Sequence, residues 1–232
     1  LSPPNLPGWD RIAICEELTK RFGGRAYLMN DANACALAEW QFGAGRGVQS
    51  MIFLTMGTGM GAGLILDGRL YDGITGNAGE VGHMRLAPDG PIGFGKHGSF
   101  EGFCSGGGIA QIAQQRIGEF GGASILKNLP NDEITARHVG EAAISGDDLA
   151  LSIWNEVGMR LAVFIDLLNP ERIVIGSIFQ RCEQFIVPSM NAVIAREALP
   201  DSARDCEVCP AQLGDEIGSY AAVAIARYHT MK

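Results

Sequence analysis

Apolar and polar positions follow two periods along the chain, which predicts helices and strands in alternation. Apolar residues recur at helical spacing in several stretches, for example across 147–168, whereas Arg172–Gly176 is a short apolar run typical of a buried strand. The predicted helices cover 12–22, 31–42, 101–118, 136–144, 147–168, 178–197 and 215–228, and the predicted strands cover 25–29, 172–176 and 205–209. This order indicates an α/β architecture.

The segment Thr55–Asp67 is predicted to form two apolar strands joined by the turn Gly57-Thr58-Gly59. Glycine lacks a Cβ, so the backbone N–H groups of such a turn can approach an anion closely, and the Thr58 hydroxyl adds a donor. A cradle for nucleotide phosphates is one interpretation. For a lone Gly-x-Gly, a flexible β-turn is the alternative.

Composition and net charge indicate which classes of partner the chain is expected to bind. The chain has 232 residues, of which 47% are hydrophobic and 19% charged, as in soluble globular proteins, and its net charge is −8 with no basic run. Nucleic acid is therefore not an expected partner, and no apolar stretch is long enough to cross a membrane. The first residues do not resemble a secretory signal, so a cytoplasmic location is expected.

The six cysteines fall mostly within apolar patterns and are expected to be free thiols. Cys206 and Cys209 form the only close pair. Because no second pair and no nearby histidine completes a zinc set, a metal or redox role for them is the minor alternative.

Four further segments carry candidate chemistry. Asn30-Asp31 lies at the start of a predicted helix, where a carboxylate could accept a proton from a bound hydroxyl while the amide orients it, or where either residue could simply cap the helix. Glu80 and His83 lie three apart in a glycine-rich loop, a spacing suited to two hydroxyls of a sugar ring, to a metal that would need more ligands, or to a solvated loop.

Glu101 begins a predicted helix and could be an ordinary first-turn acid. The glycines at 106–108 follow inside that helical pattern at a cost in helix stability, which suggests a close approach to the backbone, such as that of a ligand. The pair Gly176-Ser177, after the 172–175 strand and before a helix, is a second place where a flat group could lie against the backbone.

Taken together and in order, these segments resemble the ROK family, which comprises repressors and sugar kinases of the actin-like hexokinase superfamily. The segments that carry the resemblance are Asn5–Trp9, Leu28–Asn33, Gly43–Gly47, Leu54–Gly61, Leu70–Gly73, Ala78–His83, Asn169–Gly176 and Gly214–Gly218. The resemblance implies an actin-like (ribonuclease H-like) fold of two lobes.

The resemblance also implies a role for each candidate residue. Asp31 would be the general base for the attacking sugar hydroxyl, with Asn30 beside it. Three side chains would hydrogen-bond the other hydroxyls: Glu80, His83 and Glu101. Six residues would contact ATP, the first three its phosphates and the others its adenosine: Gly57, Thr58, Gly59, Gly106, Gly107 and Gly176. ATP and Mg²⁺ are the expected cofactors, and a homodimer is the expected assembly.

Two departures from the family pattern change the expectations. Many members hold a zinc ion through three cysteines and the histidine after Gly-x-x-Gly, but Ile92, Phe94 and Ser99 stand at the cysteine positions here. No zinc is therefore expected, and Ile92 and Phe94 are expected to pack the loop hydrophobically instead.

The second departure concerns the segment before Asn30, where the family normally has about 70 to 120 residues with an Asp-Gly-Gly-Thr-like phosphate loop. Here 29 residues precede Asn30, and no such loop occurs in the chain. We expect 1–45 to represent part of a first lobe, 46–212 a complete second lobe, and 213–232 a helix that packs toward the first lobe. Gly43–Gly47 would be the hinge between the lobes.

The sequence therefore predicts ATP-dependent phosphorylation of a hexose or an N-acyl hexosamine. Without the first phosphate loop, phosphoryl transfer by this chain is expected to be weak. Two alternatives stay open: a sugar-sensing regulator of the same family and a sugar-binding module without catalysis.

Overall fold

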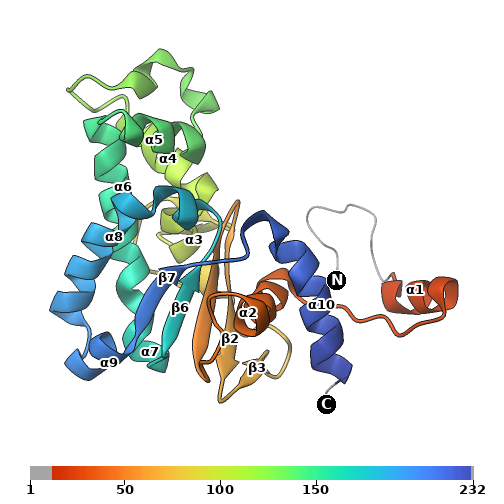
Figure 1. The fold of residues 1–232 in the computed structure, drawn as a ribbon. Helices are drawn as coiled ribbons and strands as arrows, with labels where there is room; N and C mark the ends of the chain where they lie inside the picture. The colour runs from red at the N-terminus through yellow and green to blue at the C-terminus, as the bar shows by residue number, and fades with distance from the viewer. Residues whose placement is uncertain (1–11, 231–232) are drawn as a thin grey trace.

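A five-stranded sheet forms the centre of the molecule in the computed structural model, which describes residues 12–230 (Figure 1). The strands follow the order β3-β2-β1-β6-β7. Their bounds are Met51–Met56 (β1), Met60–Leu66 (β2), Arg69–Tyr71 (β3), Arg172–Ile175 (β6) and Glu207–Pro210 (β7). Strands β1, β2 and β3 are antiparallel neighbours, whereas β6 runs parallel to β1 and β7 runs parallel to β6.

The sheet is buried on both faces, which explains why its central strands are continuous apolar runs. In β1, Ile52 and Leu54 join one hydrophobic core, whereas Met51 and Phe53 join the other. The larger core includes residues of α3 (Phe100–Cys104), α4 (Gly106–Arg116), α5 (Ala136–Ile144), α6 (Asp148–Leu161) and α8 (Ile178–Glu197). The smaller one lies under α2 (Asp31–Phe42) and α10 (Ile217–Thr230), which pack on each other.

Helix α2 approaches β2 very closely because both elements present small residues at their contact. A Cβ added to Gly63 would lie 2.4 Å from the Cβ of Ala36, and one added to Gly61 would lie 3.5 Å from the Cβ of Ala32. The first turn of α2 is therefore held beside β2, close to the turn that precedes this strand.

Most of the predicted elements are confirmed, including the helices at 136–144 and 178–197. The strand predicted for 25–29 is wrong, since these residues have no regular structure, Leu28 is 75% exposed, and no described strand pairs with them. The helix predicted for 101–118 is broken at Ser105, whose backbone is extended (φ −80°, ψ 163°). The helix predicted for 147–168 continues after α6 as a 3₁₀ turn and α7 (Ile165–Leu168).

The remaining short elements lie at the edges of the molecule. Helix α1 (Ile14–Phe22) buries none of its residues and stands apart from the sheet in Figure 1. Helix α9 (Pro200–Asp205) precedes β7. A small hairpin pairs β4 (Ile92–Gly93) with β5 (Lys96–His97). The segment Asn5–Trp9, which contributed to the family resemblance, lies outside the described residues.

The six cysteines are free, as predicted. Cys206 contacts the larger core and Cys209 the smaller one, so the pair faces opposite sides of the sheet and cannot form a disulfide without breaking β7. Burial raises the pKa of each of these two thiols to about 11.

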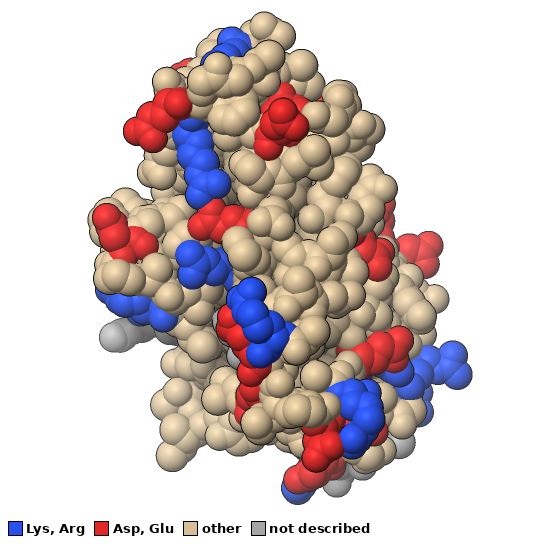
Figure 2. Space-filling model, turned by 90° about the vertical axis from the view of Figure 1, so that its left-hand side faces the viewer, with Lys and Arg blue, Asp and Glu red and all other residues tan. Residues whose placement is uncertain are grey.

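The face shown in Figure 2 carries basic and acidic side chains next to one another, with large uncharged areas between them. On α9, Arg204 pairs with Asp201 and Asp205. In the described part of the chain, no helix has the length and hydropathy needed to cross a membrane.

Candidate active site

The glycine turn between β1 and β2 lies against the N-terminus of α4. Within the turn, Gly57 N donates to Gly59 O over 3.1 Å, and Gly106 N donates to Gly57 O over 2.8 Å. Ser105 caps α4 by accepting a hydrogen bond from Gly108 N. Thr58 is exposed at the tip. A glycine turn beside the positive end of a helix dipole is an arrangement that suits phosphate oxygens.

Glu101 reaches the same turn from α3. Its Oε2 accepts a hydrogen bond from Met60 N over 3.1 Å, and a Cβ added to Gly59 would lie 2.9 Å from that oxygen. A larger residue than glycine at position 59 would therefore displace the carboxylate. The structure thus brings Glu101, which is predicted to bind the sugar, into direct contact with the turn that is predicted to bind the phosphates.

Glu80 precedes a single 3₁₀ turn, Val81–His83, whose last residue is His83 and which packs beside Glu101. A Cβ added to Gly82 would lie 2.3 Å from Met60 O and 3.3 Å from Glu101 Cβ, so this loop sits on the start of β2. The turn brings the two side chains together, with His83 Nε2 3.9 Å from Glu80 Oε2 and both groups partly exposed. They form a small polar surface next to Glu101.

Asn30 and Asp31 occupy the start of α2, and Asn30 is the cap. Asn30 Oδ1 accepts from Asn33 N over 3.2 Å, which leaves its Nδ2 group for other partners. Asp31 is the first helical residue, and its Oδ1 accepts from Ala32 N over 2.8 Å. Both residues are exposed, so the capping alternative is correct for Asn30 and leaves the second oxygen of Asp31 accessible.

A cavity of about 280 Å³ opens at the carboxyl ends of the parallel strands. It is lined by Cys35, Phe53, Thr55, Gly176, Ser177, Gln180, Arg181, Ala211, Gly214, Asp215 and Ile217. Ligands of open α/β sheets bind at this end of the strands. Cys35 is one helical turn after Asp31 on α2, so the carboxylate lies at the same side of the helix as the cavity.

Two features of the cavity wall bear on its chemistry. Burial, together with the nearby carboxylates of Asp31 and Glu39, raises the pKa of Cys35 to about 11, so this thiol stays neutral. Ser177 has a positive φ of 57°, in the region that favours glycine. This strained turn between β6 and α8 lies at the predicted adenosine contact Gly176.

The predicted site residues thus fall into two groups that meet at the end of the β1–β2 hairpin. Glu80, His83, Glu101 and the glycine turn form one group, and Asp31 with the cavity around Gly176 forms the other. No hydrogen bond among the described residues joins Asp31 to Glu80, His83 or Glu101. At two of the helix glycines, the group that approaches the backbone closely is another part of the protein backbone. Gly102 O occupies the position that a Cβ of Gly108 would take, and Gly57 O lies beside Gly106.

Sequence reasoning missed several residues of the site. The cavity is also lined by Phe53, Gln180 and Arg181, which no motif singled out. Phe94 and Lys96 contact His83, with ring centroids 4.6 Å apart and a hydrogen bond of 2.6 Å from Lys96 Nζ to His83 O. Side chains of an exposed hairpin carry no sequence signal for such contacts.

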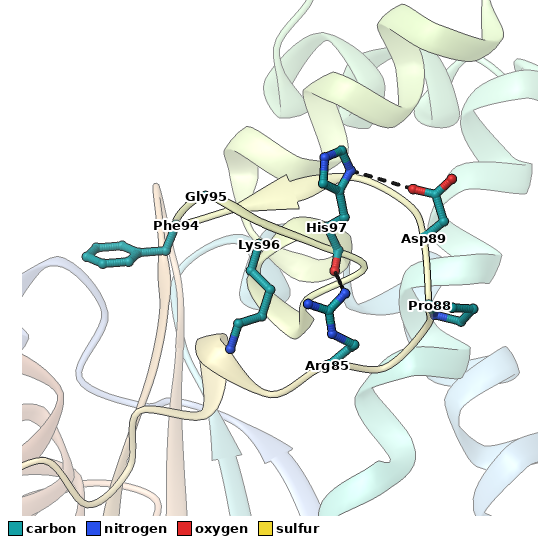
Figure 3. A pocket seen from close by; sticks show the side chains of 7 residues that line it. All are labelled: Arg85, Pro88, Asp89, Phe94, Gly95, Lys96 and His97. Carbon is teal, nitrogen blue, oxygen red and sulfur yellow. Dashed lines mark hydrogen bonds and ion pairs between the residues drawn. The ribbon is translucent and has the colours of Figure 1, made fainter.

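The expectation that Ile92 and Phe94 pack the loop hydrophobically is wrong, because they are 42% and 71% exposed. Phe94 is one of the residues that line a cavity of about 500 Å³ beside the hairpin, and in Figure 3 its ring points away from the other labelled side chains. Ser99 is fully buried and caps α3 through Gly102 N. None of these three side chains can serve as a zinc thiolate, so the donors present do not fit the family's zinc site.

Comparison with known proteins identifies the lineage of this fold and site. A sequence model described as the ROK family matches residues 1–229. Glucokinase of Thermotoga maritima is 31% identical over 97% of this chain and 73% of its own length, and the transcriptional repressor Mlc of Escherichia coli is 30% identical over 93% and 53%. The chain belongs to the ROK family, and the predicted resemblance is confirmed.

Solved structures agree with this assignment. A ROK glucokinase of Streptomyces griseus in complex with glucose and AMPPNP superposes with a TM-score of 0.78 at 32% identity, covering 95% of this chain and 74% of the other. A ROK transcriptional regulator homologous to E. coli Mlc superposes with a TM-score of 0.87 at 30% identity, covering 98% and 58%. The expected α/β fold of the actin-like sugar kinases is confirmed, and the chain spans 53% to 74% of these four relatives.

Proposed function

We propose that the protein phosphorylates a hydroxyl group of a hexose or an N-acyl hexosamine, with ATP as the phosphoryl donor. The observation that carries the proposal is the contact of Glu101 with Gly59 and Met60, because it joins a carboxylate suited to sugar hydroxyls to a turn suited to phosphates. Phosphoryl transfer depends mainly on such positioning of acceptor and donor.

Asp31 is the proposed general base. Its free oxygen accepts the proton of the attacking hydroxyl while that hydroxyl oxygen bonds to the transferred phosphorus, and Asn30 Nδ2 orients the hydroxyl. Glu80, His83 and Glu101 hydrogen-bond the remaining hydroxyls. ATP, when bound, supplies the phosphoryl group and leaves as ADP.

The residues present fit a nucleotide. Gly57, Thr58 and Gly59 offer backbone and hydroxyl donors beside the start of α4, and Gly106 and Gly107 lie at that start. Gly176 lines the cavity at the carboxyl ends of the strands. The described residues contain no group of three metal-ligating side chains. Mg²⁺ in kinases is held by one or two carboxylates together with phosphate oxygens, so it would be recruited with the nucleotide.

A sugar-sensing regulator is the second candidate, and the high structural similarity to the Mlc-like regulator favours it. Both candidates bind a sugar at the same residues. They differ in whether ADP is released, which makes turnover the deciding measurement.

The test is sugar-dependent ADP release with glucose, N-acetylglucosamine and N-acetylmannosamine, combined with calorimetric sugar binding. For a kinase, Asp31→Asn should lower kcat by about 10²- to 10⁴-fold and change the sugar Kd by less than about threefold. Because transfer by this chain is expected to be weak, slow ADP release above the sugar-free background supports the kinase, whereas binding of sugar without any ADP release would support the regulator. Equal ADP release by wild type and Asp31→Asn would reject Asp31 as the base.

A further inference from the structure

The β4–β5 hairpin has an unusual residue at its tip. Phe94 and Gly95 form its two-residue loop, with φ values of 49° and 73°. Such loops favour Asn-Gly or Asp-Gly, because both central residues need positive φ. A bulky residue in the left-handed region is sterically disfavoured, so Phe94 is present against the local backbone preference.

Burial of the ring does not offset this cost, since Phe94 is 71% exposed. Its contact is with His83 instead: the ring centroids are 4.6 Å apart and the planes meet at 65°, an edge-to-face arrangement. Aromatic pairs in this geometry attract one another beyond the effect of area burial. The strained tip of the hairpin therefore places an aromatic ring against His83, a residue that is predicted to bind the sugar.

Lys96 holds the same histidine from its backbone side. Its half-buried side chain donates from Nζ to His83 O over 2.6 Å. His83 is thus fixed at both its ring and its carbonyl by two residues of one hairpin.

The hairpin itself is firmly attached to the frame of the site. A Cβ added to Gly93 would lie 2.6 Å from Gly102 N and 2.7 Å from Glu101 Cβ, so β4 lies directly on the first turn of α3. Arg85 donates to His97 O over 2.9 Å, and Gln111 exchanges two hydrogen bonds with the backbone of Ile92. One rigid element therefore spans Glu101 and His83.

We propose that Phe94 and Lys96 are positioning residues that orient the His83 imidazole toward a hydroxyl of the bound hexose. The inference rests on the proposed function. The hairpin holds His83 in place by ring packing and a charged hydrogen bond, a task that a bound metal would otherwise perform. The side chains at these positions do not fit zinc. Fixing a ligand side chain before binding reduces the entropy cost of association.

Phe94→Gly and Lys96→Met test the proposal. Glycine keeps the positive φ of the turn and removes the ring together with Cβ, whereas methionine keeps the apolar stem and removes the donor. Phe22→Ala is the control for the first, because Phe22 is a similarly exposed phenylalanine (74%) on α1. Lys127→Met is the control for the second, because Lys127 Nζ also donates to backbone carbonyls, those of Phe120 and Gly122.

Two measurements are made on each variant. Proton NMR of the ligand-free protein follows the ring signals of His83, assigned with His83→Gln among the four histidines. Calorimetry gives the Kd for glucose, N-acetylglucosamine and N-acetylmannosamine. We expect Phe94→Gly to move the His83 signals and raise the sugar Kd by about fivefold to tenfold, Lys96→Met to raise it by a similar factor, and both controls to change neither quantity.

Unmoved His83 signals in Phe94→Gly overturn the inference whatever the sugar result. Moved signals with an unchanged sugar Kd overturn it as well, since the contact would then be structural only. If the wild-type protein binds none of the three sugars, the proposed function fails, and the positioning role fails with it. If the wild-type protein binds a sugar and the variants bind it equally well, only the positioning role fails.

Discussion

Glu101 is the residue through which the two halves of the candidate site touch. One carboxylate oxygen accepts the hydrogen bond of Met60 N and faces Gly59, while its Cβ borders both Gly82 and Gly93. The side chain therefore braces the glycine turn in the free protein and, in the proposed function, also binds the sugar. Substitutions that separate these two tasks are informative.

Glu101→Gln retains an oxygen that can accept from Met60 N but removes the negative charge. Because hydrogen bonds to an ionised acceptor are roughly twice as strong as neutral ones, we expect the sugar Kd to rise about tenfold and the AMPPNP Kd to change less than about twofold. Glu101→Ala removes the brace as well and should weaken both. An equal loss of both affinities in Glu101→Gln, measured by calorimetry, would contradict the division of tasks.

At the scale of elements, the position of Asp31 depends on how closely α2 lies on β2. A methyl group at position 63 would overlap Ala36 Cβ and the carbonyl of Ala32, whereas one at position 61 would make ordinary contacts of 3.5 Å. Gly63→Ala should therefore destabilise the protein by about 1–3 kcal/mol in urea unfolding, and Gly61→Ala by less than about 0.5 kcal/mol. Similar values for both would show that α2 can move away freely.

The stability of helix α6 depends on the carboxylate of Asp147, and this contribution changes with pH. Asp147 caps α6 through Ala150 N and also accepts from Ile125 N over 2.7 Å. Burial acts to raise the pKa of Asp147, but these backbone donors and the Ser124 hydroxyl outweigh it, and the pKa lies below its usual 3.8. A lowered folded-state pKa contributes stability above the unfolded-state value, and that contribution is lost as pH falls through the folded-state value.

Asp147→Asn should accordingly lower the free energy of unfolding by about 1 kcal/mol at neutral pH, with a smaller difference from wild type below about pH 4. Urea unfolding at the two pH values measures this. A difference that stays constant across the acid range would mean that the charge of Asp147 contributes nothing.

The sequence predicted those elements whose pattern is decided locally. The helices at 136–144 and 178–197 and the Thr55–Asp67 hairpin follow from periodicity and glycine turns. The failures have tertiary causes. Residues 25–29 are apolar enough for a strand but have no described strand to pair with, and Ser105 breaks a helical pattern because its hydroxyl caps α4. The contact of Phe94 with His83 depends on a hairpin whose placement no short-range pattern encodes.

For the molecule as a whole, the buried carboxylate of Glu39 joins segments on either side of the site. Glu39 is fully buried in α2 and accepts from Ala44 N over 2.7 Å and from Leu213 N over 2.9 Å, while Gln212 N donates to both of its oxygens. The loop it holds leads into Gly214 and Asp215, which line the cavity. The expected hinge at Gly43–Gly47 is thus tied to α2 in this structure.

Glu39→Gln tests this connection. Each carboxylate oxygen faces two backbone N–H groups, so the amide NH₂ of glutamine must oppose donors at one of the two positions. We expect a loss of about 2–4 kcal/mol in unfolding free energy, faster hydrogen exchange across 43–47 and 211–217, and a higher AMPPNP Kd. Glu171→Gln is the matched control: Glu171 Oε2 accepts from Gln49 N and Ser50 N at the opposite, amino end of β1, so its loss should leave the AMPPNP Kd unchanged. If Glu39→Gln speeds exchange in both segments but binds AMPPNP like wild type, the loop supports the fold alone and the helix that carries Asp31 is not coupled to the cavity.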